Sequence, residues 1–358
     1  MKNHCSIFWI LILLTFLFPF LTKGSMKEQF PWTKTFGVNV SVNISEKDIE
    51  DLSEWGVGHI RLSFPTEPLM NVEPPYDFNE NSFEKLAKIL DICEKYNIGV
   101  IIDPHKYPGT GHQWTMLGND EFWTDFKWHE NVIAIWERIA KICTSKGEVV
   151  AGYALLNEPA IPYNHKKNTP SDLNLFYTKL ITAIRKIDNK HAIILSAPRL
   201  GTTGGNDKDY VDGLEYLEPL NDKNLCYEIH MYQPMGFTHQ GVFEDSEMVK
   251  YPGVIDNENW NIEKIRKHLK PANDYAKKNN VKIYVGEFSC PRWLGDSGNQ
   301  YLSDMITVFN EYGFSWAYHA YRESQIWDAE INNYDKNDFS RKITTPRKEL
   351  LISSFKSK

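Results

Sequence analysis

The chain has 358 residues, of which 42% are hydrophobic and 24% charged, and its formal net charge is −7. These values are ordinary for a globular protein and exclude a disordered or collagen-like chain. The acidic balance argues against a nucleic-acid partner, because proteins that hold a polyanion usually carry a basic excess. The length allows one large domain or two to three smaller ones.

The first 24 residues are interpreted as a signal peptide and not as part of the fold. Residues 7–21 form an apolar run in which Thr15 is the one polar residue, with Lys2 before it and Gly24-Ser25 after it. The run is shorter than the about 20 residues that a membrane-spanning helix needs. We therefore expect cleavage near Gly24, a secreted extracellular protein with no membrane attachment, and one folded domain over residues 25–358.

Four cysteines follow the signal segment, at positions far apart in the sequence: Cys93, Cys143, Cys226 and Cys290. They form no C-x-x-C pair and are too few for a disulfide scaffold in a chain of this length. We expect buried single thiols, although one disulfide remains open. No cluster with the spacing of metal ligands is present in the sequence, so no metal or cofactor is expected.

Eight β-rich runs recur along the chain and alternate with amphipathic stretches. The runs cover residues 36–40, 58–63, 98–103, 149–156, 192–196, 225–230, 281–285 and 313–317. Strands that alternate with helices indicate a parallel sheet, either doubly wound or closed. Eight units favour a single (β/α)8 barrel, and no G-x-G-x-x-G follows the first run.

Helical periodicity fills the intervals between the runs. Apolar residues recur every three to four positions over residues 83–93, 131–143, 173–187 and 262–276. Ser45 followed by Asp48 predicts a further helix start. Pro271 is expected to kink or break the last of these helices.

Polar and aromatic residues stand at the ends of the predicted strands. In a (β/α)8 barrel, the carboxyl ends of the strands carry the active site. All these ends except the fifth supply such a residue: Asn39, Arg61, Asp103 with His105, Asn157 with Glu158, His230 with Tyr232, Glu287, and Trp316.

Two glutamates among these residues come from roughly opposite sides of the ring. Glu158 follows the fourth predicted strand and Glu287 ends the seventh. Two facing carboxylates suit the hydrolysis of a glycosidic bond, in which one protonates the leaving oxygen and the other attacks the sugar or activates water. Arg61 beside one carboxylate would favour its ionised form.

Three short motifs in this order resemble glycoside hydrolase family 5, the cellulase-type (β/α)8 enzymes. They are LLNEP at residues 155–159, HMY at 230–232 and VGEF at 285–288, and the resemblance covers the chain from about Phe36 to Trp316. It implies a retaining mechanism through a covalent glycosyl-enzyme, with the two carboxyl groups about 5–5.5 Å apart. Lys106 stands where many members carry a second histidine after the third strand.

The resemblance also implies a role for each matching residue. Glu158 corresponds to the general acid/base and Glu287 to the nucleophile. The remaining positions imply a substrate-binding set: Asn157 at the sugar 2-hydroxyl, Arg61 and Tyr232 beside the nucleophile, His105 and His230 as subsite histidines, and Trp316 as the platform under the sugar.

Other aromatic and charged residues have two interpretations each. Trp293, Trp327 and Trp114 are candidates for the cleft, since sugar rings stack on aromatic planes. Trp128 and Trp136 are expected to pack between helices and barrel. A salt-linked loop is favoured over sugar binding for Arg322, Glu323, Asp328 and Glu330. Glu228 shares the strand parity of His230 and is expected to point inward, without an assigned role, whereas His239 is expected to be a loop residue.

The sequence thus predicts a secreted, monomeric, retaining hydrolase of β-linked polysaccharide or oligosaccharide, with endo-β-1,4-glucanase first. β-Mannanase, xyloglucanase, mixed-linkage glucanase and exo-β-glucanase remain alternatives. Two further alternatives are a barrel that binds carbohydrate without catalysis and a metal-dependent hydrolase that uses His105 and His230. The absence of H-x-H on the first strand counts against the metal-dependent hydrolase.

Overall fold

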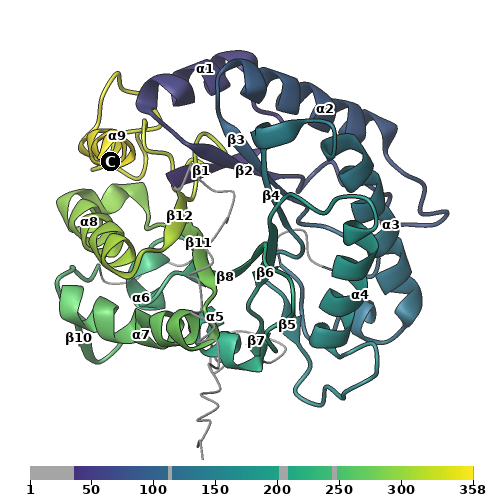
Figure 1. Cartoon of the computed structure of the whole chain (residues 1–358). Coiled ribbons are helices and arrows are strands. Elements are labelled where there is room, and N and C mark those ends of the chain that lie inside the picture. The colour runs from purple at the N-terminus through teal and green to yellow at the C-terminus, as the bar shows by residue number, and fades with distance from the viewer. Residues whose placement is uncertain (1–35, 112–114, 201–208, 244–247, 358) are drawn as a thin grey trace, which may run out of the picture.

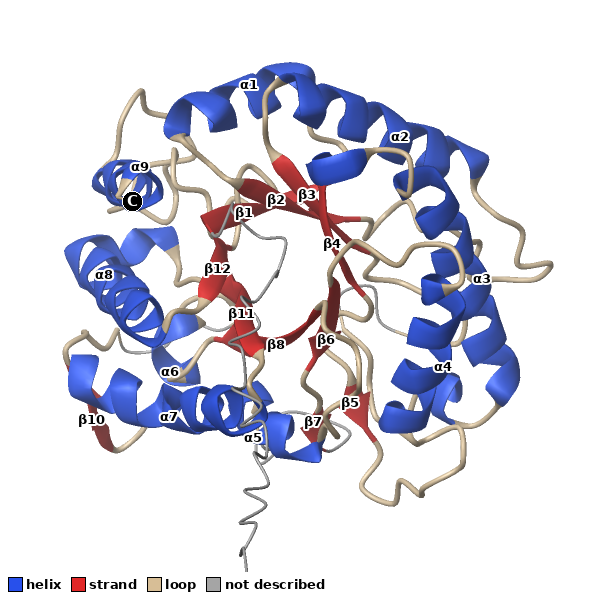
Figure 2. Cartoon of the chain, in the orientation of Figure 1, coloured by secondary structure: helices blue, strands red, loops and turns tan. Residues whose placement is uncertain are grey.

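The computed structural model describes residues 36–111, 115–200, 209–243 and 248–357. Within these residues, eight parallel strands close into a barrel in the order β1–β12–β11–β8–β6–β4–β3–β2, with β2 paired to β1 (Figure 2). The closed ring confirms the (β/α)8 barrel and excludes a doubly wound sheet. The barrel strands are β1 (Phe36–Ser41), β2 (His59–Ser63), β3 (Gly99–Asp103), β4 (Val150–Ala154), β6 (Ile193–Ser196), β8 (Leu225–Met231), β11 (Lys282–Phe288) and β12 (Ser315–Tyr318).

Helices surround the ring of strands on its outer side (Figure 1). The longer ones are α1 (Glu46–Trp55), α2 (Glu80–Lys95), α3 (Phe126–Cys143), α4 (Leu173–Arg185), α7 (Ile262–Asn279), α8 (Gly295–Tyr312) and α9 (Pro346–Lys356), and α5 (Tyr210–Gly213) and α6 (Met235–Thr238) are single turns. Two short ladders lie outside the barrel: β5 (Ala160–Ile161) with β7 (Arg199–Leu200), and β9 (Gly253–Ile255) with β10 (Glu258–Trp260).

The helix boundaries test two of the local predictions. Ser45 caps α1 in a capping box, in which its side chain accepts from the backbone of Asp48 and Asp48 bonds back to Ser45, so the predicted start is confirmed. The prediction for Pro271 is wrong insofar as it expected a break, because α7 continues through it to Asn279. A proline removes one backbone donor, and burial of Ile265, Leu269 and Ala272 supports the helix on both sides of it.

Two apolar layers hold the barrel together. A small inner cluster fills the ring with Ile101, Ala154, Ile194, Cys226, Tyr284 and Ala317. A much larger cluster, which includes Val100, Ile102 and Trp316, fills the space between strands and helices. Successive side chains of a strand alternate between these layers, so each strand has a fixed inward parity.

Cys93, Cys143, Cys226 and Cys290 are all buried and none of the four forms a disulfide, as expected from their spacing. No helix among the described residues is both long and apolar enough to cross a membrane. The proposed signal peptide, residues 1–24, lies outside the described residues.

Candidate active site

The side chains that face into the barrel change from apolar to polar toward the carboxyl ends of the strands. On β8, Cys226 belongs to the inner apolar cluster, and Glu228 and His230 follow at spacings of two. On β3, Asp103 follows Ile101 in the same way. The barrel therefore carries a buried polar layer directly above its apolar filling.

Glu287 reaches this layer through an irregularity in β11. Tyr284 faces inward, so regular alternation would turn Glu287 toward the helices. The pairing of β11 with β8 shifts register between Val285 and Glu287, and skips Gly286. Such a bulge re-aims the side chains after it. The bulge at Gly286 thus turns the Glu287 carboxylate into the barrel mouth.

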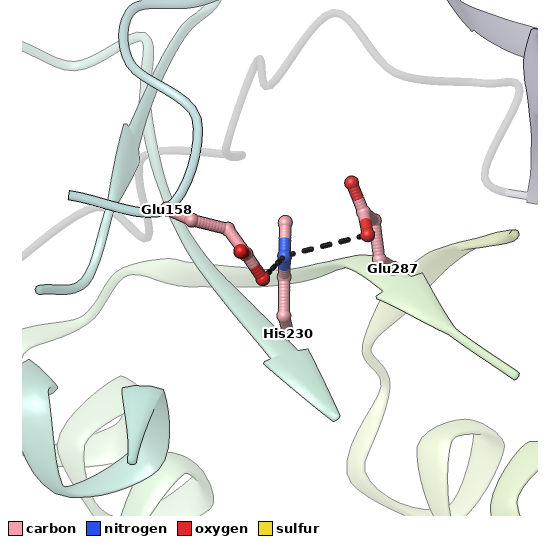
Figure 3. Close-up of side chains that lie close together, drawn as sticks. All are labelled: Glu158, His230 and Glu287. Atoms are coloured by element: carbon pink, nitrogen blue, oxygen red, sulfur yellow. Dashed lines mark hydrogen bonds and ion pairs between the residues drawn. The ribbon is translucent and has the colours of Figure 1, made fainter. Parts of the chain in front are cut away.

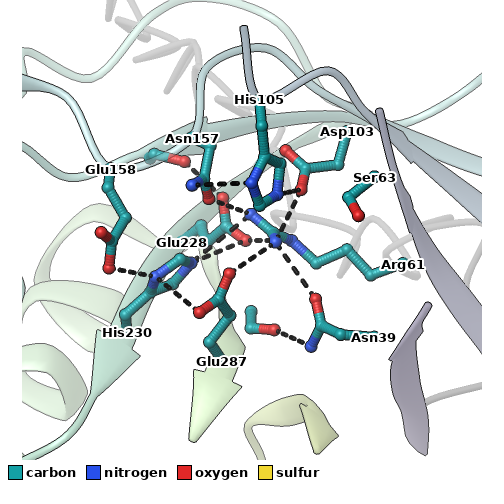
Figure 4. A network of polar contacts seen from close by, with 12 residues as sticks. Asn39, Arg61, Ser63, Asp103, His105, Asn157, Glu158, Glu228, His230 and Glu287 are labelled. Atoms are coloured by element: carbon teal, nitrogen blue, oxygen red, sulfur yellow. Dashed lines mark hydrogen bonds and ion pairs between the residues drawn. The ribbon is translucent and has the colours of Figure 1, made fainter. Parts of the chain in front are cut away.

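Arg61 lies at the centre of the polar layer and is completely buried (Figure 4). Its Nη1 is 2.6 Å from Oδ2 of Asp103 and 3.0 Å from Oε1 of Glu287, and its Nε is 3.0 Å from Oε1 of Glu228. One guanidinium therefore compensates three carboxylates from three different strands. Burial alone would lower the pKa of Arg61, but these carboxylates outweigh burial and raise it.

Two asparagines complete the coordination of the guanidinium. Nη1 of Arg61 donates to Oδ1 of Asn39 at 3.1 Å, and Nη2 donates to Oδ1 of Asn157 at 2.9 Å. Asn39 in turn donates to the carbonyl oxygen of Gly286 at 2.8 Å, which ties β1 to the bulge of β11. The planar donors of Arg61 thereby fix the orientation of both amides.

His105 extends the layer on the side of β3. Its Nε2 lies 2.6 Å from Oδ2 of Asp103, and its Nδ1 lies 3.4 Å from Nδ2 of Asn157. Burial opposes protonation of this imidazole, but the Asp103 carboxylate outweighs burial and raises the pKa of His105. The structure thus brings His105 and Asn157 together, as the sequence predicts.

Glu287 is held as a carboxylate by its surroundings. Tyr232 donates its hydroxyl proton to Oε2 at 2.9 Å, and Arg61 contacts Oε1. Burial would raise the pKa of Glu287, yet the positive charges of His230, His319, Arg61 and His105 together hold it well below its usual range. An ionised, hydrogen-bonded carboxylate of this kind is suited to attack an electrophilic carbon.

Glu158 faces Glu287 across the imidazole of His230 (Figure 3). Nδ1 of His230 is 2.9 Å from Oε1 of Glu158 and 3.7 Å from Oε2 of Glu287. The interacting atoms of the three residues all lie within 4.8 Å of one another, so an oxygen of each carboxylate falls within that distance. The side chain of Glu158 is 21% exposed, the most open of the three.

The contact between Glu158 and His230 moves the pKa values of the two groups in opposite directions. Burial would lower the pKa of His230, but Glu287, Glu158 and Glu228 outweigh burial and raise it to about 10. Burial would raise the pKa of Glu158, and the hydrogen bond and charge of His230 outweigh it, so that the pKa of Glu158 is lowered. These opposite shifts favour an imidazolium at His230, with Nδ1–H facing a Glu158 carboxylate.

Trp316 corrects one expectation, because it does not lie beneath the cleft. It is completely buried among the outer apolar cluster, stacked on Phe36 at 4.8 Å between ring centroids and in contact with Phe355 of α9. Its neighbour Ala317 takes the inward position on β12. Alternation along the strand places Trp316 on the helix side.

Trp327 takes a place beside the site instead. Its ring centroid is 6.3 Å from that of Tyr232, 6.2 Å from His319 and 5.7 Å from His239. His239 in turn stacks on Phe243, with ring planes 7° apart and 81% of Phe243 exposed. Aromatic rings therefore follow one another from Tyr232, which donates a hydrogen bond to Glu287, to Phe243 at the surface. His239 lies directly after α6 and outside any helix or strand, as expected, but no spacing in the sequence marks its ring for this run.

The other candidate tryptophans have different positions. Trp293 is half-buried, and its indole N–H donates to the carbonyl of Gln240 at 3.3 Å. Lys336 lies 5.6 Å from its ring, and these contacts do not reach the two glutamates. Trp128 and Trp136 are buried in the outer cluster, as expected for packing. Trp114 lies outside the described residues.

The charged segment after β12 is salt-linked, which agrees with the favoured interpretation. Arg322 pairs with Asp48, with Asp51 at 3.3 Å and with Glu330 at 2.7 Å, and Arg341 pairs with Asp328 at 2.8 Å. Glu323 differs, because its Oε1 accepts from the hydroxyl of Ser63 at the end of β2, at 3.0 Å.

Alanine variants of Trp316 and Trp327 form a matched pair, because one ring is in the outer apolar cluster and the other lies beside the site. Trp316→Ala should lower the free energy of unfolding by about 3–5 kcal/mol, because it empties a buried site. It should leave kcat/KM of the folded enzyme unchanged. Trp327→Ala should lower kcat/KM about tenfold, because it removes the ring that packs on Tyr232. Urea unfolding and initial rates at low temperature separate the two effects, and a selective loss of activity in Trp316→Ala would contradict the assignment.

Comparison with known proteins identifies this arrangement. The family model described as Cellulase (glycosyl hydrolase family 5) matches residues 22–325. The chain belongs to glycoside hydrolase family 5. The resemblance drawn from the three short motifs is thereby confirmed, and the protein is a glycoside hydrolase.

The chain is similar over most of its length to curated proteins and to solved structures. Endoglucanase C of Acetivibrio thermocellus is 29% identical over 84% of this chain and 89% of its own length. Cellodextrinase A of Ruminococcus flavefaciens is 25% identical over 76% of each chain. The structure of Thermotoga maritima Cel5A in complex with mannotriose has a TM-score of 0.66 at 22% identity, over 89% of this chain and 97% of that one, which shows a shared fold.

Proposed function

We propose that this family 5 protein is a secreted endo-β-1,4-glucanase that retains anomeric configuration, with Glu287 as nucleophile and Glu158 as acid/base. The observation that carries the mechanism is the approach of an oxygen of Glu158 to within 4.8 Å of one of Glu287. Retaining glycosidases hold their carboxyl groups about 5–5.5 Å apart, whereas inverting ones need about 6.5–9.5 Å to admit a water.

The reaction then proceeds in two steps. Glu287 attacks the anomeric carbon, the glycosidic bond breaks, and the leaving oxygen takes a proton from the pair of Glu158 and His230. Water next attacks the same carbon, releases Glu287, and returns a proton to the pair. Arg61 and Tyr232 keep Glu287 ionised for the first step and stabilise it as it departs in the second.

Two observations support a β-glucan as the substrate. The curated relative with 29% identity over most of both chains is named an endoglucanase. The aromatic run from Tyr232 through Trp327 and His239 ends at Phe243, which is 81% exposed, and pyranose rings stack on exposed aromatic rings. An extended row of this kind favours a chain of sugars over a single residue.

Secretion as a monomer is the second part of the proposal. The apolar run at residues 7–21, with Lys2 before it and small residues after it, supports a cleaved signal peptide. Mass spectrometry of the protein from culture medium should give a new N-terminus near Ser25. A cell-bound chain that retains its first 24 residues would contradict secretion.

Release of reducing ends from a panel of purified glycans tests the substrate. Carboxymethylcellulose and mixed-linkage glucan should be cut fastest, with a rapid fall in viscosity and products of mixed length. Faster cleavage of mannan or xyloglucan would replace the substrate but keep the mechanism. Release of glucose alone would indicate exo action, and binding without hydrolysis would indicate a non-catalytic barrel.

A chelator control addresses the metal-dependent alternative. Glu158, His230 and Glu287 are close enough to hold an ion. Arg61 already supplies a fixed positive charge beside Glu287, however, and His105 is engaged by Asp103 and Asn157. We expect unchanged rates after dialysis against EDTA, and a loss restored by a divalent cation would favour the metal-dependent hydrolase.

A further inference from the structure

Glu228 is a fully buried carboxylate that the two-step mechanism leaves without a role. It lies on β8, two residues before His230, with no exposed side-chain surface. Its Oε1 is 3.0 Å from Nε of Arg61 and 3.6 Å from Nε2 of His230, and its Oε2 accepts from the hydroxyl of Ser196. Removing a carboxylate from water is costly unless its partners compensate it, so this position needs an explanation.

The Glu228 carboxylate lies against the backbone of Gly286, where a side chain would collide with it. A Cβ at Gly286 would lie 1.8 Å from its Oε1. Any side chain at Gly286 would therefore displace Glu228 from Arg61 and His230. The same glycine forms the bulge that turns Glu287 inward, so one position serves both carboxylates.

Glu228 touches both halves of the reaction machinery. On one side it binds Arg61, which also binds Glu287. On the other side it faces Nε2 of His230, whose Nδ1 faces Glu158. A carboxylate beside each ring nitrogen favours the doubly protonated imidazolium, in which Nε2–H faces Glu228 and Nδ1–H faces Glu158.

We propose that Glu228 is a positioning residue that keeps His230 doubly protonated toward Glu158 and moderates the charge that Arg61 presents to Glu287. This inference rests on the proposed roles of Glu158 and Glu287. It makes Glu228 responsible for the pH range over which the acid and the nucleophile are both in their working states.

His230 and Glu228 are each surrounded by further charged and titratable groups. His230 faces Glu158, Glu287, Glu228, Arg61 and the ring of Tyr210. Glu228 faces Arg61 and His230, and the charges of Glu228 also act on Tyr177, Cys226 and Tyr284. Arg61 and His230 are the two cations in direct contact with Glu228, so removal of its charge acts on them first.

Glu228→Gln keeps the size of the side chain and removes its charge. Without that charge, His230 loses its proton more readily, so the alkaline limb of kcat/KM should move to lower pH by about one unit or more. Arg61 would then have one carboxylate fewer to compensate and should hold Glu287 ionised to lower pH, so the acid limb should also move to lower pH. A role in packing alone would lower the rate or the stability and leave both limbs in place.

Two further variants separate charge from structure. Ser196→Ala removes the hydrogen bond to Glu228 and keeps the carboxylate, so its limbs should match those of the unaltered enzyme. Glu228→Asp keeps the charge at a greater distance, so its alkaline limb should lie between those of the enzyme and Glu228→Gln. Unmoved limbs in Glu228→Gln, with an active unaltered enzyme, would overturn the inference, whereas an inactive unaltered enzyme would overturn the proposed function.

A measurement on the unaltered protein covers the case in which Glu228→Gln does not fold. Side-chain 15N resonances report whether each histidine is neutral or doubly protonated. The resonances of His230, assigned by comparison with His230→Gln, should show a doubly protonated ring at pH 8, where an unperturbed histidine with a pKa of about 6.5 is neutral. A neutral His230 at that pH would overturn the inference.

Discussion

Glu287→Gln should abolish hydrolysis, with kcat on any β-glucan reduced by about 10⁴-fold or more. The amide has the size of the carboxylate but cannot attack the anomeric carbon, and the loss of a group that acts in covalent catalysis is of this order. Arg61 and Tyr232 would remain in place, so substrate binding should survive. Incubation with a 2-fluoro glycoside should add the mass of one sugar to the unaltered enzyme and none to the variant.

The control for this experiment is a glutamate outside the barrel mouth. Glu311→Gln alters the end of α8, where Glu311 pairs with Arg266 on α7. It should retain full activity, since this exposed pair lies on the helix layer. Near-normal rates in Glu287→Gln, or a trapped sugar on another residue, would refute the assignment of the nucleophile.

Glu158→Ala should lower the rate on β-glucan by about 10²–10⁴-fold, the usual range for loss of a general acid. The loss should depend on the leaving group. A dinitrophenyl glycoside departs without protonation, so formation of the glycosyl-enzyme should be nearly unimpaired. Added azide should restore turnover with this substrate, because it needs no general base to attack the intermediate.

The configuration of the azide product tests which glutamate has which role. Rescue of Glu158→Ala passes through the covalent intermediate and should yield the β-glycosyl azide. Rescue of Glu287→Ala would instead proceed by direct displacement and yield the α-glycosyl azide. Products with the opposite configurations, determined by proton NMR, would exchange the two roles.

The placement of the site residues follows from parity, and parity explains both what the sequence predicts and what it misses. Glu228 and His230 face inward because they continue the two-residue spacing of Cys226, which is visible in the sequence. The family resemblance implies a place for Trp316 in the cleft, whereas its neighbour Ala317 has the inward position. Alternation shows only that neighbouring side chains face opposite sides of a strand. At least one residue must be known to face inward, and the sequence of β12 alone does not identify one.

Glu287 shows the opposite situation. Its assignment rests on the motif VGEF, whereas strict alternation from Tyr284 would have turned it toward the helices. The bulge at Gly286 resolves the difference, and a register shift arises from pairing with β8, which no local pattern records. The sequence does not mark His239 and Phe243 for a related reason, since the contact of His239 with Trp327 depends on how two loops meet, and Phe243 joins the run only through His239.

The contacts of Arg61 have a consequence for how such a protein can change over time. They join β1, β2, β3, β8, β11 and the segment after β4, so the groups proposed to cleave the substrate also fasten one end of the ring. Selection for a stable barrel and selection for catalysis therefore act on the same side chains. New substrate preferences would have to arise in segments such as that of His239 and Phe243, where a substitution leaves this fastening intact.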